Sequence, residues 1–152
     1  VLIGNRLCTH AGVGSDFLKS VGFWKMDIAD ESIISDYLND LFHYKPNEFT
    51  FDGSYDRNNT GVIPSYYGDD DWQSPIWIRP KSLQRVNENT DLKKNYIQIV
   101  GHTQQDHIDI KGKTTGGKYY YIDTLPSGEY LIDVDGEFEI GYATIVKYIK
   151  DE

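Results

Sequence analysis

Short apolar runs alternate with turn-forming residues along most of the chain, and this pattern predicts strands in both halves. The clearest run is 96–100, Tyr-Ile-Gln-Ile-Val, in which four of five residues are apolar. A run this short and this apolar predicts a buried strand. It stops at Gly101, and His102 and Thr103 follow, so a rigid strand presents polar side chains at its end.

A similar pattern occurs near the start of the chain. Residues 1–3 and 7–9 flank Gly4-Asn5-Arg6, which predicts either a hairpin or a single strand with a bulge. The second piece ends at His10, and small residues follow it. Taken alone, a His in either position is more often structural than a ligand.

Helical periodicity lies between these two strand regions. Residues 15–21 predict a short helix, and Asp30 is a suitable N-cap for a second helix over 31–42. A third short helix is predicted over 82–89. Six apolar residues of the second helix are expected to share one face: Ile33, Ile34, Tyr37, Leu38, Leu41 and Phe42.

The stretch 43–76 interrupts this pattern with Pro, Gly and Asn residues and with aromatic residues between them. Long irregular segments inside a compact domain are often functional, so we interpret 43–76 as an insertion or lid. Its acidic run at 69–71 is more simply a solvated turn.

Strands predicted over 107–110, 119–122, 129–134, 138–140 and 142–150 make the second half a β-meander, with a bulge or bend at Gly141. The predicted fold class is therefore α+β. We expect a mixed or antiparallel sheet with helices on one face, in a single domain that spans 1–152.

Composition narrows the function classes. The 152 residues suffice for one domain with a core, and the net charge of −9 disfavours nucleic acid and anionic membranes as partners. The single Cys8 permits no internal disulfide and fits a reducing, cytoplasmic compartment. No apolar run approaches the length of about 18 residues that a membrane-spanning helix needs.

Three side chains are the candidates for chemistry: His10, His102 and Arg79. Neutral imidazole is a good ligand for Mn, Fe and Zn. Arg79 lies between Ile78 and Pro80 on stiff backbone, and its guanidinium group matches phosphate bidentately, although a surface salt bridge is the default interpretation. Nucleotide-binding glycine loops, paired zinc cysteines and serine-nucleophile elbows are absent from the sequence.

Four short motifs follow one another along the chain: Leu-Cys-Thr-His-Ala-Gly at 7–12, Ile-Trp-Ile-Arg at 76–79, Ile-Val-Gly-His-Thr at 99–103 and Tyr-Ile-Asp-Thr at 121–124. Together they resemble the calcineurin-like metallophosphoesterases, and most of all the bacterial and phage branch of the phosphoprotein (Ser/Thr) phosphatases. The stretch between His10 and Arg79 is longer than in the small phage enzymes, which implies an inserted cap.

The resemblance implies that the chain is the C-terminal half of a β-sandwich domain. It implies that His10 and His102 bind the second of two divalent metal ions (Mn, Fe or Zn) and that Arg79 binds the substrate phosphate. Asp123 would have a structural role or would contact the metal ligands without binding the metal itself. The family motifs Gly-Asp-x-His-Gly, Gly-Asp-x-x-Asp-Arg and Gly-Asn-His-Glu, which supply the other ligands and the general acid, do not occur here. We therefore expect this chain to be inactive by itself and, since its only Met is Met26, to be a piece of a longer protein.

The expected partners are a phosphorylated substrate, either a phosphoprotein or a small phosphoester, and the missing N-terminal half of the domain. A sheet cut from its partner half exposes apolar surface, so a homodimer is a further expectation. Two alternatives stay open. One is a dinucleoside polyphosphate hydrolase of the same superfamily, and the other is a non-catalytic binding or structural module whose aromatic loop, 49–77, recognises a partner.

Overall fold

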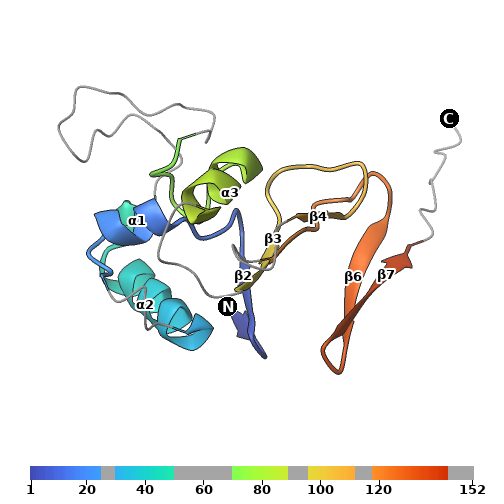
Figure 1. The fold of residues 1–152 in the computed structure, drawn as a ribbon, viewed down its shortest axis with the longest axis horizontal. Coiled ribbons are helices and arrows are strands. Elements are labelled where there is room, and N and C mark those ends of the chain that lie inside the picture. Colours follow the sequence, from blue (N-terminus) through green and yellow to red (C-terminus); the bar gives the residue numbers. More distant parts are fainter. Residues whose placement is uncertain (25–29, 50–69, 89–95, 112–117, 144–152) are drawn as a thin grey trace, which may run out of the picture.

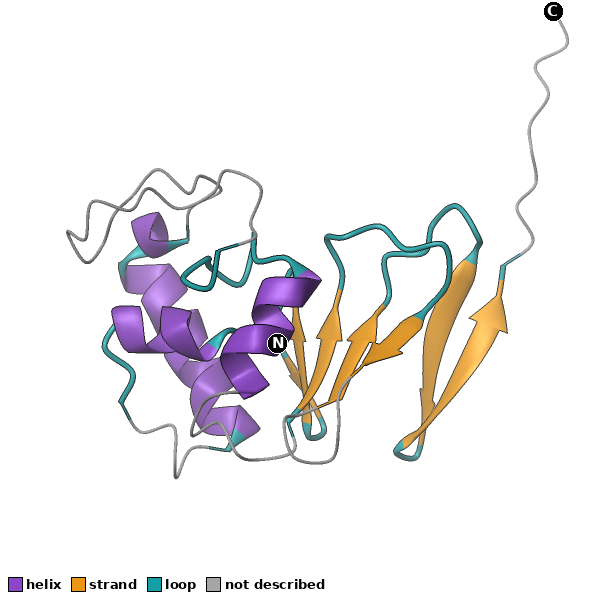
Figure 2. Cartoon of the chain, turned by 45° about the horizontal axis from the view of Figure 1, so that its top comes forward, coloured by secondary structure: helices purple, strands orange, loops and turns teal. Residues whose placement is uncertain are grey.

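A computed structural model describes residues 1–24, 30–49, 70–88, 96–111 and 118–143. These residues form an α+β fold with a mixed five-stranded sheet, a separate two-stranded sheet and a few helices (Figure 1). The helices cover one side of the larger sheet, and the smaller sheet lies on its other side (Figure 2). The predicted fold class is thus confirmed at this level. Most of the predicted 43–76 insertion, residues 50–69, and the predicted last strand beyond residue 143 lie outside the described residues.

The five-stranded sheet has the order β1-β2-β3-β5-β4. Its strands are β1 (Leu2–Ile3), β2 (Arg6–Thr9), β3 (Ile97–Val100), β4 (Asp109–Lys111) and β5 (Lys118–Tyr121). Of the two alternatives for the N-terminal residues, the hairpin is confirmed and the single bulged strand is wrong, because β1 pairs antiparallel with β2.

The meander predicted over 107–150 is confirmed only in part: β4 and β5 pair antiparallel, but the next strand, over 129–134, lies in the separate sheet. The larger sheet is mixed. Strand β3 pairs in parallel with both β2 and β5, and only β4 runs antiparallel to β5. Parallel neighbours need a long crossover connection, which the helical segments between β2 and β3 provide. Apolar periodicity predicted the strands, but it carried no information on which strands pair.

The two-stranded sheet is the hairpin β6 (Glu129–Val134) and β7 (Glu137–Tyr142). Its turn is at Asp135-Gly136, where both residues have positive φ. The bulge predicted at Gly141 is absent, since Gly141 pairs regularly with Tyr130. A Cβ at Gly141 would lie 2.4 Å from the Tyr130 ring, so the glycine is explained by the ring that lies over it.

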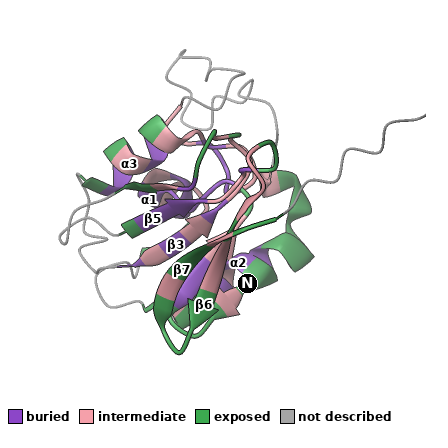
Figure 3. Ribbon diagram, turned by 90° about the vertical axis from the view of Figure 1, so that its right-hand side faces the viewer, coloured by how far each residue is buried: buried purple, intermediate pink, exposed green. Residues whose placement is uncertain are grey.

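Arg6 of β2 joins the hairpin to the larger sheet. Its Nη2 donates a hydrogen bond to the Gly136 carbonyl (2.8 Å), and its Nε lies 3.2 Å from the Asp133 carboxylate. The guanidinium group also lies over the Phe138 ring, which packs against Tyr120 of β5. Figure 3 shows that much of the hairpin remains exposed or half-buried.

The helices are α1 (Ser15–Ser20), α2 (Glu31–Tyr44) and α3 (Pro80–Glu88), with a 3-10 turn η1 (Pro46–Glu48) after α2. The Asp30 carboxylate accepts a hydrogen bond from the Ile33 amide, which confirms the predicted N-cap. The predicted apolar face of α2 is too wide, because Ile33 and Phe42 are 43% and 58% exposed. None of the described helices has the length and apolar character needed to cross a membrane.

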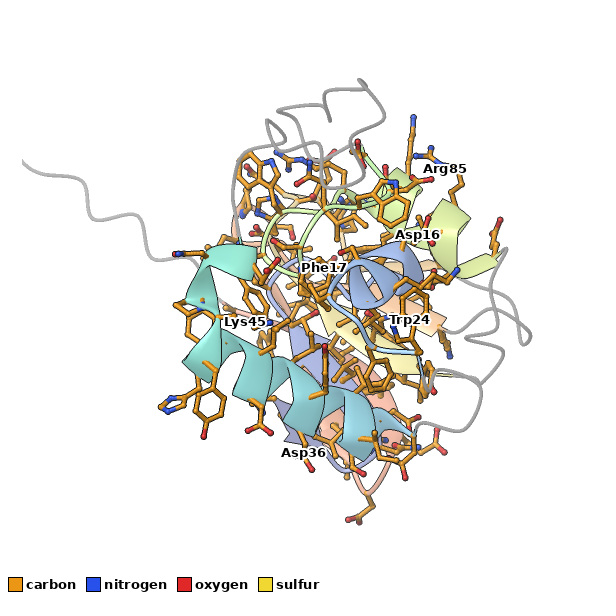
Figure 4. The ribbon with its side chains drawn as sticks, turned by 90° about the vertical axis from the view of Figure 1, so that its left-hand side faces the viewer. Asp16, Phe17, Trp24, Asp36, Lys45 and Arg85 are labelled. Atoms are coloured by element: carbon orange, nitrogen blue, oxygen red, sulfur yellow. The ribbon has the colours of Figure 1, made fainter. Side chains whose placement is uncertain are left out.

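The core lies between the helices and the sheet. Figure 4 looks onto this helix layer, with Phe17 inside it and Asp36 projecting outward from α2. One cluster of buried side chains joins α1 and α2 to β2: Leu7, Val13, Phe17, Leu18, Phe23, Ile34, Leu38, Leu41 and Tyr96. A second joins one α3 residue, Leu83, to the centre of the sheet and the segments beside it: Ala11, Ile78, Leu83, Val100, Tyr119 and Tyr121.

A buried polar network fixes the segment that follows His10. The Gln98 side-chain oxygen accepts a hydrogen bond from the Val13 amide (2.8 Å), and Asn87 donates to the Val13 carbonyl (3.0 Å). The Asn87 side-chain oxygen also accepts from the Ser15 amide. Buried polar groups that are all hydrogen-bonded specify one arrangement of the chain, so β3 and α3 together hold the loop after β2 in place.

Candidate functional site

The carboxyl ends of three parallel strands meet at one edge of the larger sheet. His10 directly follows β2, Gly101 and His102 follow β3, and Asp123 lies just beyond β5. The backbone pairing continues past the strand ends, because the Gly101 amide donates to the His10 carbonyl (2.9 Å) and the Ile122 amide donates to the Val100 carbonyl (2.8 Å). This edge is where open sheets with parallel strands usually bind ligands.

The two predicted imidazoles are in contact at this edge. The His10 Nε2 and His102 Nδ1 atoms lie 3.0 Å apart, and the ring centroids are separated by 4.8 Å. The His10 side chain is exposed and the His102 side chain is half-buried. The fold thus brings together two residues that are 92 positions apart in the sequence.

His102 has an unusual backbone conformation, with a φ of 66°. For a residue with a Cβ this left-handed conformation costs about 1–2 kcal/mol. It belongs to a tight turn in which the Thr103 amide donates to the Gly101 carbonyl (2.7 Å). Such strain is concentrated at functional sites, where the surrounding structure maintains it.

The surroundings of His102 favour its neutral form. Burial lowers the pKa of the imidazole, and the positive charges of Arg79 and His10 lower it further. Asp123 and the Trp77 backbone act in the opposite direction, with smaller effects. Neutral imidazole is the form that binds metal ions, so the electrostatics of the site suit a ligand.

Arg79 reaches the same edge from the segment before α3. Its Nη1 donates a hydrogen bond to the Thr103 hydroxyl (3.2 Å), next to His102. Its guanidinium carbon lies 5.3 Å from the centre of the Trp77 ring, and the same ring lies 5.0 Å from that of His102. All three predicted site residues therefore belong to one cluster, together with Trp77 and Thr103.

Trp77 and Thr103 were not among the candidates from sequence. An aromatic residue two positions before an Arg and a hydroxyl directly after a His are both too common to be singled out. Their importance comes from contacts that only the fold creates. The sequence signal was limited to their membership in the same short motifs as Arg79 and His102.

His107 lies apart from the site. Its side chain is 78% exposed and its Nδ1 is 2.8 Å from the Glu129 carboxylate. Asp123 stays close enough to act on the pKa of His102, and its backbone carbonyl accepts a hydrogen bond from the Gln105 amide (2.8 Å). Asp123 therefore supports the loop that follows His102.

The imidazole pair suits a metal ion in part. The 3.0 Å separation of His10 and His102 is that of a hydrogen bond between the rings. Two nitrogens at about 2.1 Å from one ion would be about 3.0 Å apart at the right angle of an octahedral site and about 3.4 Å apart at the tetrahedral angle typical of zinc. In the described part of the chain, no three His, Cys, Asp or Glu side chains are grouped so that they could hold a metal. The pair thus provides two donors, and a complete site would need more.

A small cavity of about 210 Å³ adjoins His10. It lies beside β2 and α2, and His10 forms part of its lining. Apolar side chains contribute most of the remaining lining, among them Leu38, Phe42, Phe49 and Ile76. The organic part of a small ligand that contacts His10 could extend into this space.

Comparison with known proteins gives no assignment: no family model, no curated protein and no solved structure matches this chain. The fold and the site geometry therefore carry the functional argument.

Proposed function

We propose that this chain is the C-terminal portion of a metal-dependent phosphoesterase, of the calcineurin-like class and the phosphoprotein phosphatase type. One observation carries the proposal. The His10 and His102 nitrogens lie 3.0 Å apart at the edge where Arg79 is also held, through Thr103. The order of the four sequence motifs adds support.

Each residue has a distinct role in this proposal. His10 and His102 are two ligands of a divalent ion such as Mn, Fe or Zn, which would act as a Lewis acid toward a phosphoryl oxygen. Arg79 binds phosphate oxygens, because a planar guanidinium group can donate two parallel hydrogen bonds to them. The exposed His10 leaves the site open to substrate.

The remaining ligands and a general acid would come from an N-terminal half that packs on the larger sheet. The sheet face opposite the helices could receive it, because the β6–β7 hairpin covers that face only in part. Ile3 and Ile110 are 55% and 47% exposed there, and Ile97 and Ile99 are half-buried. A second sheet on this face would complete a β-sandwich.

The two alternatives differ in how they can be tested. A dinucleoside polyphosphate hydrolase would use the same His10, His102 and Arg79, so only a comparison of substrates separates it from a protein phosphatase. The binding-module alternative depends on the aromatic loop 49–77, of which 50–69 lie outside the described residues.

Metal binding by this chain can be tested with Mn²⁺ alone. Paramagnetic Mn²⁺, added below stoichiometry, should broaden the NMR amide signals around residues 9–11 and 101–103 first. His10→Ala and His102→Ala should abolish this selective broadening, whereas His43→Ala, at an exposed position on α2, should retain it. Selective broadening elsewhere, or unchanged broadening in both site variants, would contradict the proposal.

Activity is tested in the longer protein that the proposal requires. With Mn²⁺ it should hydrolyse p-nitrophenyl phosphate, and His102→Ala should lower kcat/KM by at least about tenfold, since loss of groups at a metal site has effects of that size or more. A smaller loss would count against His102 as a ligand. Parallel assays with a phosphopeptide and a dinucleoside polyphosphate distinguish the two hydrolase classes.

A further inference from the structure

We propose that Trp77 is a positioning residue for this site, whose ring holds the His102 imidazole and the Arg79 guanidinium group in a fixed relative orientation. This inference rests on the proposed function, because it assigns the metal ligand and the phosphate-binding group to His102 and Arg79. It adds a residue that touches neither metal nor phosphate. The juxtaposition of the three side chains is its basis.

The Trp77 ring contacts both groups. Its centre lies 5.0 Å from that of the His102 ring, with the planes tilted by 51°, and 5.3 Å from the guanidinium carbon of Arg79. A guanidinium group within about 6 Å of an indole centre is attracted electrostatically to the face of the ring. One rigid side chain thus limits the motion of two functional groups.

The backbone around Trp77 is itself fixed to the site edge. The Trp77 and Ile78 amides both donate to the Ser74 carbonyl, at 2.9 and 3.1 Å, and this closes a tight turn. The Ala11 amide donates to the Pro75 carbonyl (2.7 Å), which ties that turn to the residue after His10. The backbone that carries the Trp77 ring is therefore fixed relative to the backbone next to His10.

Thr103 also contacts the Arg79 guanidinium group. Its hydroxyl accepts a hydrogen bond from Arg79, and its amide bonds within the turn that sets the His102 backbone. Arg79 is held between the Trp77 ring and the Thr103 hydroxyl. Residues that orient a metal ligand or an anion-binding group typically change affinity or activity by about 10–100-fold when removed.

The test compares Trp77→Leu with Trp77→Phe and uses Trp24→Leu as the matched control, because Trp24 is 73% exposed. The first measurement needs no metal and follows the ¹⁵N relaxation of the Arg79 Nε–H group, with exposed Arg85 as an internal reference. We expect greater mobility of Arg79 in Trp77→Leu, near wild-type order in Trp77→Phe, and no change in Trp24→Leu.

The second measurement is the Mn²⁺ titration described above. Trp77→Leu should weaken the selective broadening by about tenfold in Mn²⁺ concentration, and Trp77→Phe should recover most of the effect. If the Arg79 side chain in Trp77→Leu is as ordered as in the wild type, the positioning role is overturned, whatever the Mn²⁺ titration shows. If Arg79 is more mobile in Trp77→Leu but the wild type shows no selective Mn²⁺ binding, the positioning role is retained and the metal site is overturned.

Discussion

Gly12 and His102 have positive φ angles, 107° and 66°, close to the site edge. For His102, the left-handed backbone directs a ligand-type side chain toward His10. For Gly12, the conformation is combined with lack of space, since a Cβ there would lie 2.2 Å from a methyl carbon of the buried Leu83. The Ala-Gly pair after His10 thus allows the loop after β2 to pack closely against α3.

We predict that Gly12→Ala destabilises the chain more than Gly22→Ala. Gly22 also has a positive φ, 90°, but a Cβ there would meet nothing within 4 Å. Gly22→Ala should cost about 1 kcal/mol from backbone conformation alone, and Gly12→Ala a further 1–3 kcal/mol, roughly, from overpacking. Urea denaturation of both variants measures the difference, and equal losses would show that Leu83 moves aside at no cost.

At the scale of elements, the ends of β2 and β3 carry His10 and His102, and the loops that follow these strands hold the two residues in position. The loop from Gly101 to Ile108 carries His102 and Thr103 and returns the chain to β4. Its far end is attached to β6, because the Glu129 carboxylate accepts hydrogen bonds from the Ile108 amide (2.7 Å) and pairs with His107 (2.8 Å). The small hairpin therefore supports the loop that follows the second imidazole.

This attachment predicts a pH dependence of stability. The Ile108 amide, and after it His107, lowers the pKa of Glu129 below its ordinary value of 4.5. A carboxylate with a lowered folded-state pKa contributes stability above the unfolded-state pKa, and this contribution is lost as the pH falls through the folded-state value. The stabilisation of the wild type relative to Glu129→Gln should therefore shrink as the pH falls below about 4.5.

His107→Gln is the control for that measurement, made by urea denaturation across the pH range. It removes the His107 contact with Glu129 but leaves the Ile108 amide bonded to Glu129, which is the larger cause of the lowered pKa. Most of the pH dependence should persist in this variant. A difference that grows toward low pH would mean that Glu129 does not stabilise the fold as a carboxylate.

Sequence patterns identified most elements but not their pairing. Asp30 as an N-cap is set by local backbone chemistry and was confirmed, and of the two alternatives for residues 1–9 the hairpin was observed. The bulge at Gly141 and the full apolar face of α2 were wrong. The meander was correct for the pairs β4–β5 and β6–β7 but wrong between β5 and β6. Parallel pairing and the contact of the Tyr130 ring with Gly141 depend on residues outside the local sequence. The exposure of Phe42 depends on how α2 packs on the sheet.

On the scale of the whole molecule, the larger sheet has unequal faces. The helices lie against one face, and the β6–β7 hairpin lies on the side of the other (Figure 2). Ile110 of edge strand β4 is 47% exposed on that side. Exposed apolar surface on a sheet face or edge favours association with another chain.

We predict concentration-dependent self-association of this chain through the partly covered face. Ile110→Lys should shift the equilibrium toward monomer, whereas Ile33→Lys, at a similarly exposed position on α2 (43%), should not. Sedimentation velocity at several concentrations measures both. A wild-type chain that stays monomeric at all concentrations would contradict the prediction, as would equal effects of the two variants.

The sequence by itself determined the local features of this protein: the strand ends at His10 and His102, the helix caps and turns, and the presence of a guanidinium group on stiff backbone at Arg79. Those features depend on backbone propensities and on neighbours within a few residues. Only the tertiary structure decided that β2 and β3 are parallel neighbours, and this places the two imidazoles 3.0 Å apart. It also decided that Trp77 and Thr103 hold Arg79 beside them, because contacts between distant segments follow from packing of the whole chain.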